Sequence, residues 1–207
     1  IMEKVEGKTQ YKFKEQKSAE IFQMPTMKKY SSKIYEIIKS IEKAEGLVFV
    51  YSQFETSGIL PLAFALEMAG FTKYKSKHMP LLEYRHKKPY NGKQYLIISG
   101  KDSLKKGDVE FIKKGVNMIY EPVKVILGTK AASEGLNLFG VREMHIVDPW
   151  HNLNRLEQVV GRGTRRFSHK KLEPEKQNLT IYYYAATTPR NHEESVNSGS
   201  VWFRYLF

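Results

Sequence analysis

Three arginines within five residues are the part of the sequence best suited to chemistry. Arg162, Arg165 and Arg166 belong to the run QVVGRGTRR, residues 158–166, in which two glycines separate charged positions. A guanidinium group presents a rigid fork of N–H donors that matches the oxygens of a phosphate. A basic face that only contacts water has little need of the two glycines. The run therefore predicts a site that binds phosphate groups.

Two further polar segments follow apolar runs. Residues 128–138 read GTKAASEGLNL, where small residues let backbone amides approach an anion and Thr129 offers a hydroxyl to a phosphate oxygen. By itself this segment is equally well interpreted as an ordinary glycine-containing loop. Residues 148–152 read DPWHN, and a tryptophan at the end of a strand is more typical of a core than of a platform on which bases stack. Only the first segment therefore adds a candidate phosphate contact.

The positive charge of the chain is concentrated in one segment. The 207 residues carry a formal net charge of +12, and half of it lies in the basic segment Lys73–Gln94, where seven Lys and Arg residues accompany a single Glu. Clustered cations neutralise phosphates and release counterions, so we expect a nucleic acid as partner. Lys87, Lys88 and Lys93 are the candidate contacts, with three tyrosines nearby. A solvated insertion is the competing interpretation.

Short apolar runs predict the strands that position these segments. They lie at residues 47–51, 95–98, 123–127, 144–147 and 180–184. Helices are expected at residues 26–45, from the spacing of four isoleucines, then up to about residue 69, around residues 109–112 and at 154–160. Strands without a polar face that alternate with helices are typical of an α/β fold, a parallel sheet with helices on both faces. Ligands of such sheets bind beyond the carboxyl ends of the strands.

Three parts are expected along the chain. Residues 1–25 are rich in lysine and weakly patterned, which indicates a linker or N-terminal arm. Residues 26–190 form the α/β domain. Residues 191–207 form a C-terminal extension that packs on the domain or on other parts of the protein. Since the chain opens on Ile1 and closes on an apolar run, we expect it to be a fragment of a longer protein.

Some classes of protein are excluded by what the sequence lacks. There is no cysteine, so a disulfide framework and a thiolate zinc site are excluded, and no metal site is expected. No apolar stretch approaches the ~20 residues of a membrane span, and no signal peptide begins the chain. We expect a soluble protein in a reducing, intracellular compartment, with no membrane partner.

A nucleotide-gripping P-loop is also missing. It requires the pattern G-x-x-x-x-G-K-[ST] after a strand. Gly7-Lys8-Thr9 supplies only the tail of the pattern, and Asp102 breaks it after Gly100-Lys101. No Asp-Glu pair follows a strand to hold Mg²⁺. We therefore expect no ATP hydrolysis by this chain alone.

With these segments in this order, residues 46–185 resemble the C-terminal RecA-like domain of superfamily 2 helicases. GTKAASEGLNL resembles motif V, QVVGRGTRR resembles motif VI in its Q-x-x-G-R-x-x-R form, and VFVYSQF, residues 48–54, resembles motif IV. The segments GLNL and DPWHN favour the Swi/Snf-like branch. The run DPWHNLNRLEQVVGRGTRR is most similar to ATPases and early-transcription helicases of large nucleocytoplasmic DNA viruses. The fold implied is a RecA-like parallel sheet of the P-loop NTPase type without a P-loop of its own.

The resemblance implies roles for individual residues. Arg162 and Arg165 are the catalytic arginine fingers, which face the γ-phosphate of an ATP held with Mg²⁺ by a preceding RecA-like domain. Gly135 and Gln158 are further contacts to the nucleotide. The nucleic-acid backbone is held by Thr129, together with Ser52 and Gln53 of motif IV. Ala132-Ser133, where many Swi/Snf relatives carry glycines, and the basic segment depart from the pattern and leave the substrate open.

The implied function is that of half of an ATP-driven helicase or translocase, and so a hydrolase only in the full-length protein. Its partners would be nucleic acid, DNA rather than RNA, and the N-terminal RecA-like domain, with viral transcription machinery as a further partner. For a viral protein the place of action would be the virus factory in the host cytoplasm or the virion. The alternatives are a RecA-like module that binds nucleic acid or protein without motor activity, and an ATPase scaffold that acts on protein.

Overall fold

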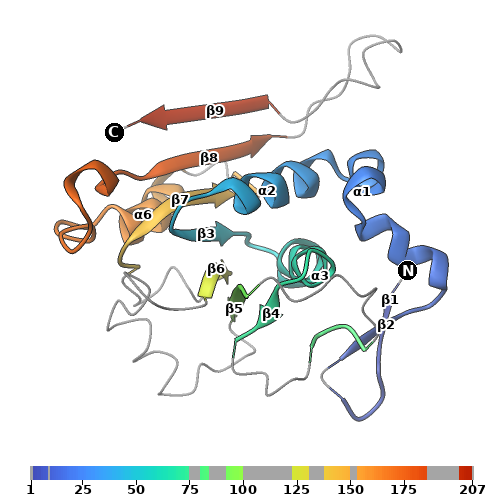
Figure 1. Cartoon of the computed structure of the whole chain (residues 1–207). Coiled ribbons are helices and arrows are strands. Elements are labelled where there is room, and N and C mark those ends of the chain that lie inside the picture. Colours follow the sequence, from blue (N-terminus) through green and yellow to red (C-terminus); the bar gives the residue numbers. More distant parts are fainter. Residues whose placement is uncertain are drawn as a thin grey trace, which may run out of the picture.

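A seven-stranded sheet forms the centre of the molecule (Figure 1). The computed structural model describes residues 2–8, 10–74, 80–83, 92–99, 123–130, 138–149, 153–185 and 201–206. The strand order is β4-β5-β6-β3-β7-β8-β9, and all but β9 run parallel. The strands are β3 Leu47–Tyr51, β4 Thr72–Lys73, β5 Gln94–Ile98, β6 Val123–Gly128, β7 Val141–Ile146, β8 Thr180–Ala185 and β9 Val201–Leu206. The predicted parallel α/β sheet is confirmed.

The central strand β3 shows why apolar runs predicted the strands well. It lies between β6 and β7, and all five of its residues are buried. Val48 and Val50 pack into the core on one face of the sheet, whereas Phe49 and Tyr51 pack into the core on the other. A strand covered on both faces needs apolar side chains at every position, so its sequence has no polar alternation. The other predicted strands begin or end within three residues of their expected limits.

Helices cover both faces of the sheet. They are α1 Met24–Tyr30, α2 Ser32–Lys43, α3 Leu60–Met68 and α6 Leu153–Gly163, with a π-helical turn η2 Glu55–Ile59 and 3-10 turns η1 Gln16–Phe22 and η4 Pro174–Lys176. α2 and α3 bury Ile38 and Leu66 against one face, and α6 buries Val159 against the other. The single helix expected at residues 26–45 is wrong. Ser31 divides it, because its extended backbone ends α1 and its hydroxyl accepts a hydrogen bond from the Ile34 amide to cap α2.

The first residues of the chain contain a small hairpin. β1 Met2–Lys4 pairs antiparallel with β2 Tyr11–Phe13. The ring of Tyr11 contacts that of Phe64 on α3 edge to face at 5.2 Å, and Phe22 of η1 contacts the same ring at 6.0 Å. This segment therefore packs on the helix layer through aromatic side chains. The expected division into arm, domain and extension stays a prediction.

The middle of the basic segment is tied to this layer by a buried carboxylate. Glu67 on α3 is 1% exposed and accepts hydrogen bonds from the amides of Leu81 (2.7 Å) and Leu82 (2.9 Å) and from the Tyr95 hydroxyl (2.8 Å). The amide of Tyr11 donates to Leu81 O at 2.6 Å. Three donors on one carboxylate offset much of the cost of burying it. The described middle of the segment is thus part of the fold rather than a free loop.

A second buried polar cluster lies between β7, β8 and α2. His145 is fully buried, with Nδ1 2.7 Å from the Tyr184 hydroxyl and its ring stacked on Tyr182 at 4.7 Å. Its Nε2 lies 3.3 Å from Glu143 Oε2, which also accepts from the Ser40 hydroxyl at 3.0 Å. Burial lowers the pKa of His145, and the opposing effect of Glu143 is smaller. The imidazole is therefore neutral in the folded protein near pH 7.

Candidate functional site

Buried hydroxyl groups line the carboxyl edge of three neighbouring strands. Ser99 follows β5, Thr129 follows β6 and Ser52 follows β3, and these strands are adjacent in the order β5-β6-β3. The three residues are 3%, 7% and 0% exposed, respectively. Their backbones continue the sheet, since the Thr129 amide donates to Ile98 O at 3.0 Å and the Ser52 amide donates to Gly128 O at 3.1 Å. The structure thus brings Ser52 and Thr129 to one edge, as expected for parallel strands.

The Ser52 hydroxyl is engaged within the chain. It donates to Asp148 Oδ2, lies 3.1 Å from Phe54 O and accepts from the Phe54 amide at 3.1 Å. Gly58 of η2 lies against it so closely that a Cβ there would come within 1.9 Å of Ser52 Oγ. We refer to Ser52, Gly58 and Asp148 as the serine corner. The corner joins the ends of β3 and β7 to the start of the α3 helix, and Gln53 beside it is partly exposed.

Thr129 differs from Ser52 in its contacts. Its backbone amide is bonded to Ile98 O, but among the described residues its hydroxyl has no hydrogen-bond partner. Buried hydroxyls are nearly always paired with protein, water or ligand. The position of Thr129 at the edge of the sheet therefore suits a contact with an oxygen from outside this part of the chain.

The arginines lie at the end of α6. The helix runs to Gly163 instead of stopping near residue 160 as expected, so Arg162 lies in its last turn and Arg165 follows two residues after its end. Gln158 is one turn before Arg162 on the same face, and it is exposed, as is Arg165, whereas Arg162 is partly buried. Leu156 and Val159 are buried against the sheet. The amphipathic helix thus presents Gln158 and Arg162 away from the sheet.

The two glycines of the arginine run have different surroundings. A Cβ at Gly163 would lie 2.8 Å from Met144 Cε and 3.3 Å from Leu179 Cδ2, so this glycine lets the helix end approach the sheet. A Cβ at Gly161 would meet nothing within 4 Å. Glycine inside a helix costs roughly 0.5–1 kcal/mol relative to alanine. The described part of the fold therefore does not explain Gly161.

Backbone hydrogen bonds join the exit of the GTKAASEGLNL segment to the arginine run. The amide of Leu138, the last residue of that segment, donates to Arg162 O at 3.1 Å. Two residues later the amide of Gly140 donates to Ser168 O at 3.0 Å. The two candidate phosphate segments, which are separated by residues 139–157 in the sequence, thus meet in space. Sequence reasoning missed Ser168 and its neighbour His169, because a Ser-His pair after an arginine run carries no recognised spacing.

Several predicted site residues lie outside the described part of the chain. They are Gly135, Lys87 and Lys88, and the expected helix around residues 109–112 lies outside it as well. Lys93 is described, directly before β5, and is partly buried. The roles of these four residues stay predictions.

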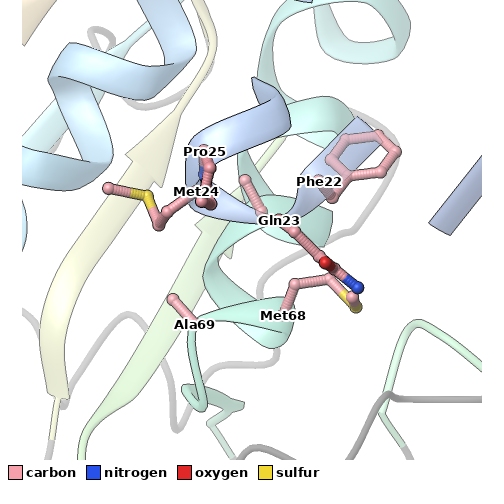
Figure 2. Close-up of a pocket in the computed structure, with 7 residues that line it drawn as sticks. Phe22, Gln23, Met24, Pro25, Met68 and Ala69 are labelled. Atoms are coloured by element: carbon pink, nitrogen blue, oxygen red, sulfur yellow. The ribbon is translucent and has the colours of Figure 1, made fainter. Parts of the chain in front are cut away.

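A separate pocket lies at the far end of α3. It has a volume of about 210 Å³ and is lined by Phe22, Gln23, Met24, Pro25, Ala65, Met68 and Ala69 (Figure 2). α3 starts next to the serine corner, at the carboxyl edge of the sheet, and its last residue Met68 is therefore at the opposite edge. The pocket is thus remote from the arginines. Its lining is apolar apart from Gln23, and it offers no group suited to phosphate.

The described residues offer neither a metal site nor a membrane-spanning helix. No three His, Asp or Glu side chains in those ranges are grouped as a metal ion would need. No helix in the same ranges is both long and apolar enough to span a bilayer.

Comparisons with known proteins agree with the fold and the motifs. Residues 30–167 match the family model described as the helicase conserved C-terminal domain. An ATP-dependent RNA helicase of Acanthamoeba polyphaga mimivirus is 34% identical over 169 residues, which cover 79% of this chain and 27% of the relative. The termination factor NPH-I homolog of African swine fever virus is 27% identical over 82% of this chain and 28% of its own length. The early transcription factor large subunit homolog of that virus is 25% identical over 78% and 15%.

These matches confirm the resemblance to the C-terminal RecA-like domain of superfamily 2 and to viral helicases of transcription. The chain spans about a quarter or less of the length of these curated relatives.

Proposed function

The chain belongs to the family of helicase conserved C-terminal domains, and we propose that it supplies the arginine fingers of an ATP-driven nucleic-acid helicase or translocase. The groups that grip the nucleotide would lie in a preceding RecA-like domain of the same protein. Two relatives are named for helicase or termination activity, and a third for early transcription, which supports a role on nucleic acid. Viral transcription machinery as a partner, and an intracellular place of action, stay predictions.

The observation that carries the proposal is the placement of Arg162 and Arg165. One lies in the last turn of α6 and the other directly beyond it, and the exposed Gln158 lies one turn earlier on the face of Arg162. The buried side of α6 is fixed on the sheet by Leu156 and Val159. Arg162 is thus carried on a helix fixed to the sheet and Arg165 on the turn that follows it, a placement that suits phosphate recognition in a transition state.

The residues present fit the phosphates of ATP but not its metal ion. Arg162 and Arg165 offer only donors, which suit the oxygens that gain charge when the γ-phosphoryl group is transferred. We assign Mg²⁺ to the preceding domain; the described residues hold no group of three acidic or His side chains for it. ATP supplies the phosphoryl group and the free energy. The arginines would bind and orient its terminal phosphate and stabilise the developing charge, with Gly135 and Gln158 as further contacts.

Open space at Gly161 supports the approach of a partner to this face. The residue lies between Gln158 and Arg162 in sequence, and no neighbour among the described residues requires a glycine there. A nucleotide or a second domain that docks against α6 would need such a position free of a side chain.

Nucleic acid would lie along the carboxyl edge of the sheet. Thr129 is the best-supported contact there, since its buried hydroxyl has no partner within the described ranges. Gln53 is accessible beside it, whereas the Ser52 hydroxyl would have to leave Asp148 in order to bind phosphate. Lys87, Lys88 and Lys93 would add charge from the basic segment. We propose DNA as the substrate, although one relative is named an RNA helicase.

Substitution of each arginine in the full-length protein tests the proposal. Arg162→Ala and Arg165→Ala should each lower kcat for ATP by at least ~10²-fold, with the KM for ATP and the melting temperature nearly unchanged. Arg166→Ala is the matched control, because the Arg166 guanidinium lies over the Phe167 ring, 4.8 Å from its centroid, and should leave kcat close to wild type. An unchanged kcat in both Arg162→Ala and Arg165→Ala would favour a binding module without motor activity.

A further inference from the structure

We propose that Ser168 and His169 are positioning residues that aim the arginine fingers, by clamping the segment after α6 to the start of β7. The proposal rests on the function proposed for Arg162 and Arg165. The match to the family model ends at Phe167, one residue before this pair, so the pair lies beyond the matched motif.

Ser168 holds the turn that contains Arg165. Ser168 is only 2% exposed, and its Oγ donates a hydrogen bond to Gly163 O at 3.0 Å. Its amide donates to Arg165 O at 2.8 Å. Hydrogen bonds from one residue thus reach the carbonyl groups on both sides of Thr164 and fix the backbone that carries Arg165.

His169 connects that turn to the sheet. Its Nδ1 lies 2.8 Å from Ser168 Oγ, and its Nε2 lies 2.7 Å from Val141 O, the first residue of β7. A carbonyl oxygen only accepts, so Nε2 donates to Val141 O, and Nδ1 shares the single hydroxyl hydrogen of Ser168 with Gly163 O. The Gly140 amide, which donates to Ser168 O at 3.0 Å, adds a second bond between the same two segments. The arginine turn is therefore anchored to β7 at two points.

Backbone strain at Phe167 indicates that this turn must be held in its conformation by surrounding contacts. Phe167 has φ of 67°, and among the described residues it is the one residue other than glycine with a positive φ. A bulky side chain avoids this region, and such a residue persists where its surroundings hold it. Its ring is 62% exposed, so burial of the ring does not hold the turn. The bonds of Ser168 and His169 directly after it do.

Positioning predicts a different result from general stabilisation. A finger contributes in the transition state, and a displacement of about 1 Å at such a group can cost ~10²-fold in rate. A loosened clamp should therefore reduce kcat and leave substrate binding and folding nearly intact. A clamp that served the fold alone would change the melting temperature and leave kcat per folded molecule unchanged.

The test compares two replacements of His169 in the full-length protein. His169→Leu removes both bonds and should lower kcat for ATP by about tenfold, with KM within about twofold of wild type. His169→Gln keeps an amide N–H that can reach Val141 O, and should recover most of the kcat. Ser168→Ala removes only the hydroxyl and should also lower kcat by about tenfold. This variant tests the proposal if His169→Leu does not fold. Lys171→Ala, an exposed neighbour, is the control and should match wild type.

A double-mutant cycle identifies the group through which His169 acts. If His169 acts through Arg165, the variant with both His169→Leu and Arg165→Ala is no slower than Arg165→Ala alone. Multiplied defects, or a wild-type kcat in both His169→Leu and Ser168→Ala while Arg165→Ala is impaired, would overturn the positioning role and leave the finger proposal standing. A wild-type kcat in Arg165→Ala would instead overturn the proposed function itself.

Discussion

The serine corner and the end of α6 are both built around small residues, but they differ in what those residues do. At the corner, Ser52 and Asp148 bond to each other, and Gly58 leaves no space for even a methyl group. At the end of α6, Gly161 faces open space and Arg165 is exposed. The corner is closed by contacts within the chain, whereas the end of α6 carries an exposed arginine and a glycine with no described neighbour within 4 Å of its Cβ position. Small residues thus form a closed joint at one place and, under the proposed function, a docking face at the other.

The closed joint should be the more sensitive to added volume. In Gly58→Ala the new Cβ would overlap Ser52 Oγ and break the corner, so we expect a loss of about 2–4 kcal/mol in the free energy of unfolding. Urea denaturation followed by circular dichroism measures this loss. Gly7→Ala is the control for a glycine without neighbours, although its φ of 70° adds some strain. A Gly58→Ala protein as stable as wild type would show that the corner can relax.

Acid should destabilise the fold through the buried cluster around His145. The folded-state pKa of His145 is lowered by burial, so the unfolded chain binds a proton more readily. The stability that the neutral imidazole provides is complete above the unfolded pKa of about 6.5 and is lost as pH falls below it, by at most ~1.4 kcal/mol per pH unit. Denaturation at pH 7.5, 6.5 and 5.5 measures the slope. His145→Gln cannot titrate there, and an unchanged slope in that variant would assign the acid sensitivity to other groups.

A side chain added at the end of α6 should reduce function while it raises stability. Gly161→Ala replaces a helix glycine where no neighbour is touched, so we expect the free energy of unfolding to rise by roughly 0.5–1 kcal/mol. If a nucleotide or domain approaches this position, ATP turnover by the full-length protein should fall despite the gain in stability. Thermal melts measure the change in stability, and steady-state ATPase assays on the same preparation measure the change in turnover. A variant that is more stable and equally active would mean that nothing docks at Gly161.

The sequence predicted the strands better than it predicted the helix limits. β3 was predicted residue for residue, because a strand buried on both faces is written as an uninterrupted apolar run. The break at Ser31 was not visible, because a serine fits the polar side of a helical pattern as well as it fits a cap. α6 was expected to end before its glycines, yet it includes both of them. Local propensity sets such ends only weakly.

The candidate site residues stay predictions, and the contacts that support them were not predicted. The arginine run and Thr129 have a chemistry that is readable from residue type. Two sets of contacts depend on which atoms meet after folding. They are the hydrogen bond from the Leu138 amide to Arg162 O and the clamp from Ser168 through His169 to Val141. The π-helical turn that brings Gly58 onto Ser52 has the same origin. No spacing of residues along the sequence predicts contacts of this kind.

The central place of β3 has a consequence for synthesis. Its two neighbours, β6 and β7, are made long after it, since about 70 residues separate Tyr51 from Val123. At ~5–20 residues per second, a ribosome needs roughly 4–14 s to supply the first partner. During that interval α2 and α3 can shelter one face of the strand, but both of its edges remain open to other nascent chains. Translation that pauses before Val123 should therefore leave an aggregation-prone intermediate, whereas a pause after Ile146 should not.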